Sequence, residues 1–499
     1  MLAIGIDSGT QSTKCLVVDT ETGDILAAAQ RGYGLIPGLP SGHMEQDPHV
    51  WVSAVDDTVR ECIALIGKRK DEVKSIGVSG QQHGLVALDK EAQVIRPAKL
   101  WCDTSTEEQC KEFGQEFGGA EGLVKLAGNP ILPGYTAPKI LWMKQNEPAN
   151  YAALNCILLP HDYINFWLTG EKRMEYGDAS GTGLLDVRKR VWCAPLCDFI
   201  DAQLREFLPT PESSREVTGL LREKLRTQWG LTGRPLVSAG GGDNMMAAIG
   251  TGNISEGVVT ASLGTSGTLF SYAKAPVVDR EGDVAAFCDS TDAWLPLICT
   301  MNVTVATEQA RQLFGWNLSQ LEEAVANTRP GADGLLFLPY LNGERTPDLP
   351  NGCGVLHGLT TRNMTPAHLA RAVTEGATLG LAYGLKRLRQ AGVTPAEIRL
   401  TGGGSKSETW RQICADVFGV ATICLKSSES AALGAAAQAC WAHDRANGKP
   451  GSLADITKRL VKLDEKSRCE PEKEATELYK GLLARQTDLT RKLRAVGFE

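Results

Sequence analysis

The stretch Leu236-Val237-Ser238-Ala239-Gly240-Gly241-Gly242-Asp243-Asn244 lies near the middle of the 499-residue chain and runs on into the small-residue segment Met245–Gly250. This pattern predicts a short buried strand, a triple-glycine turn and the first turn of a helix. Consecutive glycines cost backbone entropy, so a chain keeps them for a tight turn or for close approach of its backbone. Asp243 is expected at the helix start, where ligands lie in α/β folds. An ordinary helix N-cap is the alternative role for this aspartate.

Two similar hairpins open the two halves of the chain. They are Ile6–Thr13 (Ile-Asp-Ser-Gly-Thr-Gln-Ser-Thr) and Leu263–Thr268 (Leu-Gly-Thr-Ser-Gly-Thr), each between apolar runs that predict strands. Both turns are rich in backbone donors and hydroxyl groups, which suit phosphate oxygens, and the carboxylate of Asp7 could orient a hydrated metal. Either turn alone could be an ordinary hairpin. Together they predict a duplicated fold whose halves face a shared ligand.

A third glycine turn, Thr401–Ser405, lies between a predicted strand at Ile398–Leu400 and a predicted helix at Ser407–Phe418. A strand end of this kind lets the backbone approach a planar base or its phosphates closely. The turn therefore adds a candidate nucleotide contact in the second half of the chain.

Two polar turns in the first half suit a hydroxylated ligand instead. Ser79–Gly84 follows the predicted strand Val73–Val78, and Trp101-Cys102-Asp103 begins a loop before a helix predicted from a Thr104/Glu107 capping box. An indole beside a carboxylate is a common carbohydrate surface, although a buried tryptophan beside a capping aspartate explains the pair equally well.

Composition and charge exclude several classes of function. The chain has 52 basic and 59 acidic residues, for a formal net charge of −7, and its lack of a basic run argues against a nucleic-acid partner. The start of the chain lacks signal-peptide features, and uncharged stretches such as 257–273 are too rich in Gly, Ser and Thr for membrane spans. The 14 cysteines include only a lone pair at Cys193 and Cys197, so zinc is not expected. We therefore expect a cytoplasmic protein with neither nucleic-acid nor membrane partners.

Several catalytic signatures are absent from the sequence. There is no P-loop, no Gly-x-Gly-x-x-Gly, no Gly-x-Ser-x-Gly and no His-Glu-x-x-His. What remains is two phosphate-type hairpins, a third glycine turn and the carboxylates Asp7 and Asp243. That set suits phosphoryl transfer, in which one carboxylate accepts a hydroxyl proton and the other serves the metal.

The motifs taken together resemble the FGGY family of carbohydrate kinases. The match covers nearly the whole chain in order: Gly5-Ile6-Asp7-x-Gly9-Thr10, Gly80-Gln81-x-His83-Gly84, Trp101-x-Asp103, Gly240–Asn244, Leu263–Gly267, Phe337–Pro347 and Thr401–Gly404. Within the family, the Gln-x-His-Gly turn and the Phe337–Pro347 loop look most like the xylulokinase branch. The resemblance implies an α/β fold of two actin-like (ribonuclease H-like) lobes, 1–245 and 246–499, with ATP, Mg²⁺ and sugar in a central cleft. It implies ATP-dependent phosphorylation of D-xylulose. A homodimer is possible, but the sequence does not decide the oligomeric state.

The resemblance also implies roles for individual residues. Asp243 resembles the general base, and Asp7 the acidic residue that serves phosphate and magnesium, the latter through water. Sugar contacts are expected from Gln82, His83, Trp101, Asp103 and Asn244. Nucleotide contacts are expected from Thr10, Gly264, Thr265, Gly403 and Ser407.

Three departures from the family pattern bear on the substrate. Gln82 stands where xylulokinases commonly have methionine, Cys102 where they often have asparagine, and Ser8 where an apolar residue is usual. The first two lie in the expected sugar pocket, so they leave the exact sugar open. We expect Gln82 to reach the sugar through its backbone.

Two alternatives accompany this interpretation. One is a sister kinase acting on ribulose, a polyol or a sugar acid. The other is a nucleotide switch of the same fold, like actin or the heat-shock chaperones. The carboxylate of Asp243 within a triple-glycine turn and the polar turn Gln81–Gly84 argue against the switch.

Overall fold

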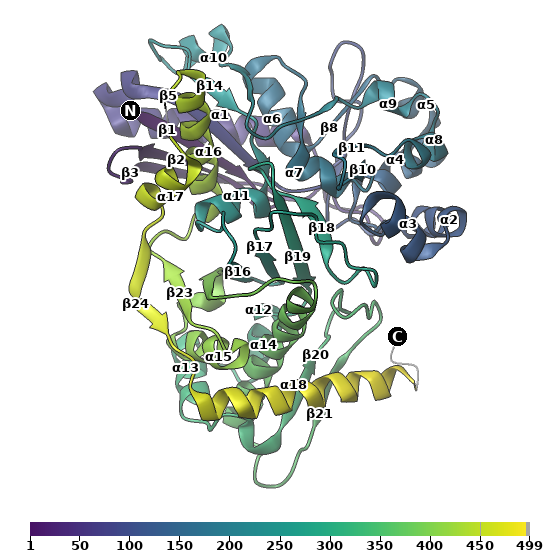
Figure 1. Ribbon diagram of the computed structural model, residues 1–499, viewed down its shortest axis with the longest axis vertical. Helices are drawn as coiled ribbons and strands as arrows, with labels where there is room; N and C mark the ends of the chain where they lie inside the picture. Colours follow the sequence, from purple (N-terminus) through teal and green to yellow (C-terminus); the bar gives the residue numbers. More distant parts are fainter. Residues whose placement is uncertain (450, 496–499) are drawn as a thin grey trace.

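The N-terminal strands form the centre of the first lobe in the computed structural model, which describes residues 1–449 and 451–495 (Figure 1). The first predicted hairpin is formed by β1 (Leu2–Ser8) and β2 (Ser12–Asp19), and β3 (Ile25–Gly32) extends it into an antiparallel meander. The other edge of β1 pairs in parallel with β5 (Val73–Gly80). The sheet has the order β13-β14-β5-β1-β2-β3, with β13 at Val217–Leu220, β14 at Leu236–Ser238, and the short β15 (Gly241–Gly242) beside the end of β5.

Helices cover both faces of this sheet, which explains why β1 is apolar almost throughout. The side chains of Leu2, Ile4 and Ile6 share a core with α1 (Pro48–Ile66), while Ala3 packs with α16 (Ser430–Ala446). The helix α1 begins after Asp47, whose carboxylate accepts the backbone N–H of His49 at 2.9 Å. Strand β1 thus lies between a helix from early in the chain and one from late in the chain.

The second lobe repeats the arrangement of the first. Strands β16 (Val258–Leu263) and β17 (Gly267–Ser271) form an antiparallel hairpin, and β16 pairs in parallel with β22 (Glu397–Thr401), as β1 does with β5. This repetition confirms the predicted duplicated α/β fold. The sheet order is β18-β19-β17-β16-β22-β23-β24, with β18 at Ala285–Cys288, β19 at Trp294–Thr300, β23 at Thr422–Leu425 and β24 at Leu463–Cys469.

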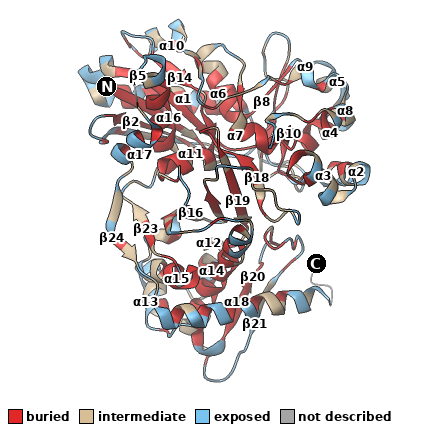
Figure 2. Cartoon of the chain, viewed as in Figure 1, coloured by how far each residue is buried: buried red, intermediate tan, exposed pale blue. Residues whose placement is uncertain are grey.

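Buried residues fill the interior of both lobes, and exposed residues concentrate on the outer helices (Figure 2). The second core is built around α14 (Pro366–Gln390) and α15 (Glu408–Phe418). Smaller elements of the first lobe are β4 (Glu45–Gln46), η1 (Gly67–Glu72), β6 (Val86–Leu88), β7 (Ala98–Lys99), α2 (Glu107–Phe117), α3 (Gly119–Ala127), α4 (Thr136–Asn146), α5 (Pro148–Ala152), β8 (Cys156–Leu158), α6 (Pro160–Thr169), β9 (Met174–Glu175), α7 (Tyr176–Ala179), η2 (Ser180–Thr182), β10 (Leu185–Asp186), β11 (Val191–Trp192), α8 (Ala194–Ile200), α9 (Leu204–Phe207), β12 (Pro211–Glu212) and α10 (Glu223–Gln228). The remaining elements are α11 (Asp243–Gly250), α12 (Thr304–Leu313), α13 (Leu318–Ala326), η3 (Ala332–Gly334), β20 (Leu336–Pro339), β21 (Gly354–His357), η4 (Gly403–Lys406), α17 (Leu453–Leu460) and α18 (Lys473–Arg494).

The first lobe is built from both ends of the chain. Helix α16 packs on β1 and β5, where a Cβ added at Gly5 would overlap the carbonyl of Ala432. It also crosses α11, where a Cβ at Gly434 would overlap the carbonyl of Met246. The predicted lobe boundary after Met245 falls inside α11 and stays a prediction.

One local expectation was wrong, and one alternative role is excluded. Helix α2 begins at Glu107 with Thr106 as its N-cap and without a side-chain cap bond, so Thr104 and Glu107 form no capping box. The N-cap of α11 is Gly242, so Asp243 is the first helical residue and its carboxylate is not used as an N-cap. Among residues 1–449 and 451–495, no helix combines the length and the apolar character needed to cross a membrane.

Candidate active site

A cavity of about 290 Å³ lies between the two lobes. Its first-lobe wall comes from the turn after β5 and the loop after β7, and its second-lobe wall from the hairpin β16–β17 and strands β18 and β19. The start of α11 closes it at the junction. Its lining includes Gln82, His83, Trp101, Tyr135, Asp243, Asn244, Gly264, Ser266, Thr268, Phe287, Cys299 and Arg345.

The two predicted catalytic carboxylates flank the end of β5. Asp7 on β1 is opposite Ser79, and Ser79 is in turn opposite Gly241, two residues before Asp243. Burial, and then the negative charges of Asp7 and Asp178, raise the pKa of Asp243 to about 7. A carboxyl group with a pKa in that range is suited to take up a proton near neutral pH.

Asp7 does not line the cavity but lies beside the first hairpin. Its Oδ1 accepts the Ser79 hydroxyl at 2.8 Å. Burial raises the pKa of Asp7, against the opposing effects of that hydrogen bond and of Lys14. In the same hairpin, Thr10 donates to Gln81 at 3.1 Å and accepts from the indole N–H of Trp101 at 2.9 Å. The hairpin is therefore tied to the polar turn after β5.

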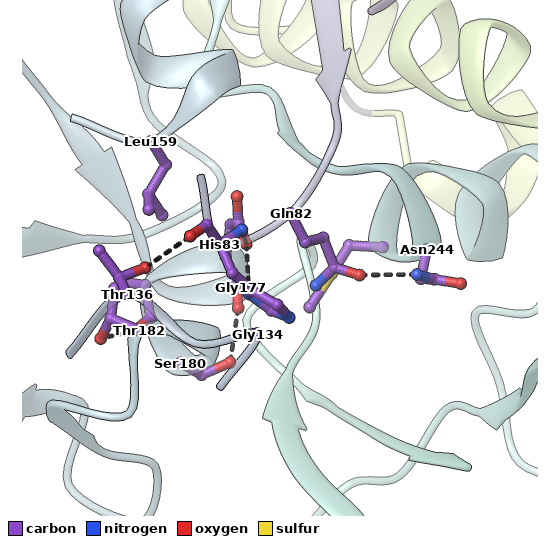
Figure 3. A network of polar contacts seen from close by, with 12 residues as sticks. Gln82, His83, Gly134, Thr136, Leu159, Gly177, Ser180, Thr182 and Asn244 are labelled. Carbon is purple, nitrogen blue, oxygen red and sulfur yellow. Dashed lines mark hydrogen bonds and ion pairs between the residues drawn. The ribbon is translucent and has the colours of Figure 1, made fainter. Parts of the chain in front are cut away.

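Gln82 and Asn244 join the two sides of the cavity (Figure 3). The amide of Asn244 donates to Oε1 of Gln82 at 2.6 Å and to Oδ1 of Asp243 at 3.0 Å. Its own oxygen accepts the Thr268 hydroxyl at 3.4 Å. The side chain of Gln82 thus holds Asn244 beside the carboxylate of Asp243.

This contact leads to a prediction for Gln82→Met. A thioether cannot accept the Asn244 bond as an amide oxygen does, and a lost bond of this kind is worth about 1–3 kcal/mol when the donor stays buried. We expect a fall in kcat of about tenfold, with the ratio of xylulose to ribulose turnover unchanged. Specificity constants for both sugars in wild type and variant measure this. A changed ratio would mean that the Gln82 side chain contacts the sugar itself.

His83 lies in a left-handed backbone conformation, with φ of +61°. Its carbonyl accepts a hydrogen bond from Thr136 Oγ1 at 3.1 Å (Figure 3). The same carbonyl accepts one from Lys139 Nζ at 2.8 Å, and the His83 ring contacts the rings of Tyr135 and Phe287. Nδ1 of His83 lies 3.4 Å from Oδ1 of Asp178. Burial lowers the pKa of His83, so the ring is neutral at pH 7. A neutral imidazole at the cavity wall can accept or donate a hydrogen bond to a hydroxyl group.

The structure does not bring Asp103 into the cavity. Its carboxylate is fully buried and accepts the N–H of Met44 at 2.9 Å, the hydroxyl of Ser105 at 2.6 Å and the ammonium of Lys99 at 3.2 Å. Since both oxygens are already used, Asp103 supports the wall behind Trp101. We therefore withdraw it as a sugar contact.

The predicted nucleotide residues are placed unevenly. Gly264 lines the cavity, and Thr265 lies between it and Ser266, which also does. Gly403 is exposed after β22. Ser407 is the N-cap of α15, where it accepts the N–H of Trp410 at 2.9 Å. The roles of these residues, and of Thr10, in binding nucleotide stay predictions.

The sequence reasoning missed two charged residues of the cavity, Asp283 and Arg345. Arg345 belongs to the polar loop 339–347, which was the available signal. The neighbouring Glu344 is buried and accepts the N–H of Met301 at 2.6 Å and the amide of Asn302 at 3.2 Å, which anchors the loop. Arg345 lines the cavity, and its Nη1 lies 4.0 Å from Sγ of Cys299, which also lines it.

Comparison with known proteins places this fold and site in a family. The N-terminal domain of the FGGY family of carbohydrate kinases matches residues 2–250, and the C-terminal domain matches residues 259–443. The chain belongs to the FGGY family. As a member of that family it is an ATP-dependent carbohydrate kinase of two actin-like lobes, which confirms the predicted fold and enzyme class and sets aside the nucleotide switch.

Individual FGGY relatives are similar over nearly their whole length. A xylulose kinase from Haemophilus influenzae is 42% identical, with 94% of this chain and 95% of the relative covered. The crystal structure of a ligand-bound xylulose kinase from Lactobacillus acidophilus superposes with a TM-score of 0.91 at 25% identity, over 99% of this chain and 98% of that one. A gluconate kinase structure from the same organism has the same TM-score, identity and coverage.

One cluster of three potential metal ligands, His43, Glu45 and Asp103, occurs among residues 1–449 and 451–495. The ammonium of Lys99 lies 3.2 Å from each of them. Because a lysine cation already neutralises these groups, the cluster is not suited to bind a metal ion. The role of Asp7 in binding magnesium stays a prediction.

Proposed function

We propose that this protein transfers the γ-phosphoryl group of ATP to D-xylulose, giving D-xylulose 5-phosphate and ADP. The observation that carries the proposal is Asp243, a carboxylate with a pKa near 7 in a cavity that joins the two lobes. The xylulose kinase from Haemophilus influenzae, similar over 94% of this chain, supports xylulose as the sugar.

In this proposal the oxygen of the sugar hydroxyl attacks the γ-phosphorus of ATP, and the hydroxyl proton passes to Asp243. The bond between the γ-phosphorus and the leaving oxygen of ADP breaks in the same step. The Asn244 amide orients Oδ1 of Asp243 for this step. Trp101 covers an apolar edge of the sugar, and neutral His83 meets a hydroxyl group. Holding the reactants in line and stabilising charge account for most of the rate enhancement in phosphoryl transfer.

The nucleotide phosphates are proposed to lie against the second hairpin, where Gly264 and Ser266 line the cavity. Mg²⁺ supplies neutralisation of the phosphate charge when it is bound with ATP. Asp7 fits this ion. Ser79 donates a hydrogen bond to its Oδ1, no described residue donates one to its Oδ2, and Oδ2 is therefore left for a hydrated cation.

The pH dependence follows from the pKa of Asp243. A base acts only when deprotonated, so kcat/KM should rise about tenfold per pH unit below a midpoint near 7 and level off above it. Buffered assays from pH 5.5 to 8.5 measure the profile. Lys139 and Glu344 also titrate near 7, so the assignment needs a second profile. The residual activity of Asp243→Asn should not show the fall in kcat/KM below about pH 7. If this fall persists in the variant, it reports the titration of another group.

A coupled ADP-release screen over ketopentoses, polyols and aldonates tests the proposed reaction, with an assay lacking sugar as its control. We expect the highest kcat/KM with D-xylulose. A preference for ribulose would overturn the xylulose assignment and leave the kinase assignment intact.

A sugar acid is the second candidate substrate. The cation of Arg345 in the cavity suits a carboxylate, and one structure of high similarity is named a gluconate kinase. In the same screen, a preference for an aldonate would favour this candidate. We expect Arg345→Met to lower kcat/KM for an aldonate by a larger factor than it lowers kcat/KM for xylulose.

A further inference from the structure

A fully buried glutamine from late in the chain lies beneath the triple-glycine turn. Gln438 belongs to α16, and its Oε1 accepts the hydroxyl of Ser238 at 2.8 Å and the N–H of Gly240 at 2.8 Å. Its Nε2 donates to the carbonyl of Gly240 at 3.0 Å and to those of Ser214 and Ser290, both at 3.4 Å. One side chain therefore binds both backbone groups of Gly240 and joins three segments of the chain.

The turn has no side chains of its own that could hold it. Gly240 has φ of +72°, which other residues seldom adopt, and a Cβ at Gly241 would overlap the hydroxyl of Ser290. A backbone of consecutive glycines is also flexible, so its position depends on groups outside the turn. Among the described residues, Gln438 is the side chain that bonds both the N–H and the carbonyl of Gly240.

The support beneath Gln438 is rigid. A Cβ at Gly77 would overlap the carbonyl of Ala435, and one at Gly250 would overlap that of Ser430. Backbone contacts this close fix α16 against β5 and against α11, the helix that begins at Asp243. The helix that carries Gln438 is therefore fixed in position, and the residue that Gln438 bonds, Gly240, lies three residues before the start of α11.

We propose that Gln438 is a positioning residue for Asp243: it fixes the glycine turn, and the turn sets where the carboxylate meets the sugar hydroxyl. This inference rests on the proposed role of Asp243 as general base. Misplacement of a reacting group by about 1 Å can cost about 10²-fold in rate, so a loosened turn should lower kcat far more than it changes sugar binding.

The test compares two buried glutamines. Gln486 of α18 is equally enclosed and donates to the carbonyls of Phe337 at 3.3 Å and Gly376 at 3.2 Å, neither of which lines the cavity. Gln438→Met and Gln486→Met each remove a buried amide, so both should lower Tm. We expect kcat to fall about 10- to 100-fold in Gln438→Met alone, with the sugar KM of both variants within about twofold of wild type.

Comparing the two variants distinguishes a specific effect on turnover from a general loss of stability. A kcat of Gln438→Met within about twofold of wild type, measured below its Tm, would overturn the inference, as would an equal fall in Gln486→Met. If Gln438→Met does not fold, Gln438→Glu keeps the shape and one accepting oxygen but presents a second oxygen to three carbonyls. The same fall in kcat is expected for it, and wild-type turnover would overturn the inference.

The double variant Gln438→Met/Asp243→Asn tests the route of the effect. If Gln438 acts through Asp243, adding its substitution to Asp243→Asn should lower kcat no further, because coupled residues are not additive. A further fall of tenfold or more would show that Gln438 acts elsewhere. Failure of the proposed function appears differently, as an Asp243→Asn variant that retains its turnover whatever residue occupies position 438.

Discussion

Asp243→Asn is expected to keep its fold and its sugar affinity but to lose turnover by about 10²–10⁴-fold, the usual cost of removing a general base. The asparagine keeps an oxygen in place of Oδ1, which accepts the Asn244 backbone N–H at 2.8 Å, so the start of α11 is preserved. What disappears is the capacity to take up the hydroxyl proton. Steady-state kinetics and calorimetric titration with xylulose separate the two properties.

Thermal stability provides the control for Asp243→Asn. Because the folded protein raises the pKa of this carboxyl, it binds the proton more tightly than the unfolded chain does, so stability is lost as pH rises from the ordinary carboxyl pKa to about 7 and the full cost remains above 7. Replacing the acid with a neutral amide removes this cost, so Tm at about pH 8 should equal or exceed that of wild type. A folded variant that retains a third or more of wild-type turnover would rule out Asp243 as the base.

Asp7→Ala is expected to lower kcat by about 10²–10³-fold, because it removes the charge proposed to hold magnesium beside the phosphates. The concentration of Mg²⁺ that gives half-maximal activity should rise, and the affinity for sugar should stay nearly unchanged, since Asp7 does not line the cavity. Titrations of activity with Mg²⁺ and calorimetry with xylulose measure the two effects. Lost sugar affinity with a normal magnesium dependence would contradict the assignment.

A matched control for Asp7 lies at the far end of the same hairpin. Asp19 ends β2 and pairs with Arg69 at 2.8 Å, opposite Leu2 and away from the cavity. Asp19→Ala should leave the magnesium dependence unchanged. Removing the charge of Asp7 should also lower the pKa of Asp243, so the acid limb of the pH profile should move to lower pH in Asp7→Ala only.

Much of the fold could be predicted from local pattern. The apolar runs at the N-terminus and the two glycine-threonine hairpins were predicted from sequence pattern and confirmed. Periodicity reveals which face of an element is apolar and where the chain must turn, and those are properties of neighbouring residues. The turns at strand ends that hold His83 and Gly264, and the turn that precedes Asp243, were found in this way, whereas the roles of these cavity residues were implied by the family resemblance.

What sequence could not supply is the partner of each residue. Asp103 was predicted to meet sugar, but Lys99 and Met44 engage its carboxylate behind the wall. That Gln82 reaches the sugar through its backbone stays a prediction, but the partner of its side chain, Asn244, lies 162 residues away and was not predicted. Neither contact has a periodic signal, because hydrogen bonds between distant segments depend on how the elements pack and not on local spacing.

The sequence by itself therefore determined the two strand–turn–strand units, their glycine turns and the carboxylate at the start of the central helix. Only the tertiary structure decided that α16, from the end of the chain, would cover the first sheet and place Gln438 beneath the glycine turn, 198 residues from Gly240. The physical reason is that an apolar face specifies burial but not the surface that buries it. That choice is made by shape, here by glycines on β1, β5 and α11 that admit the backbone of one helix.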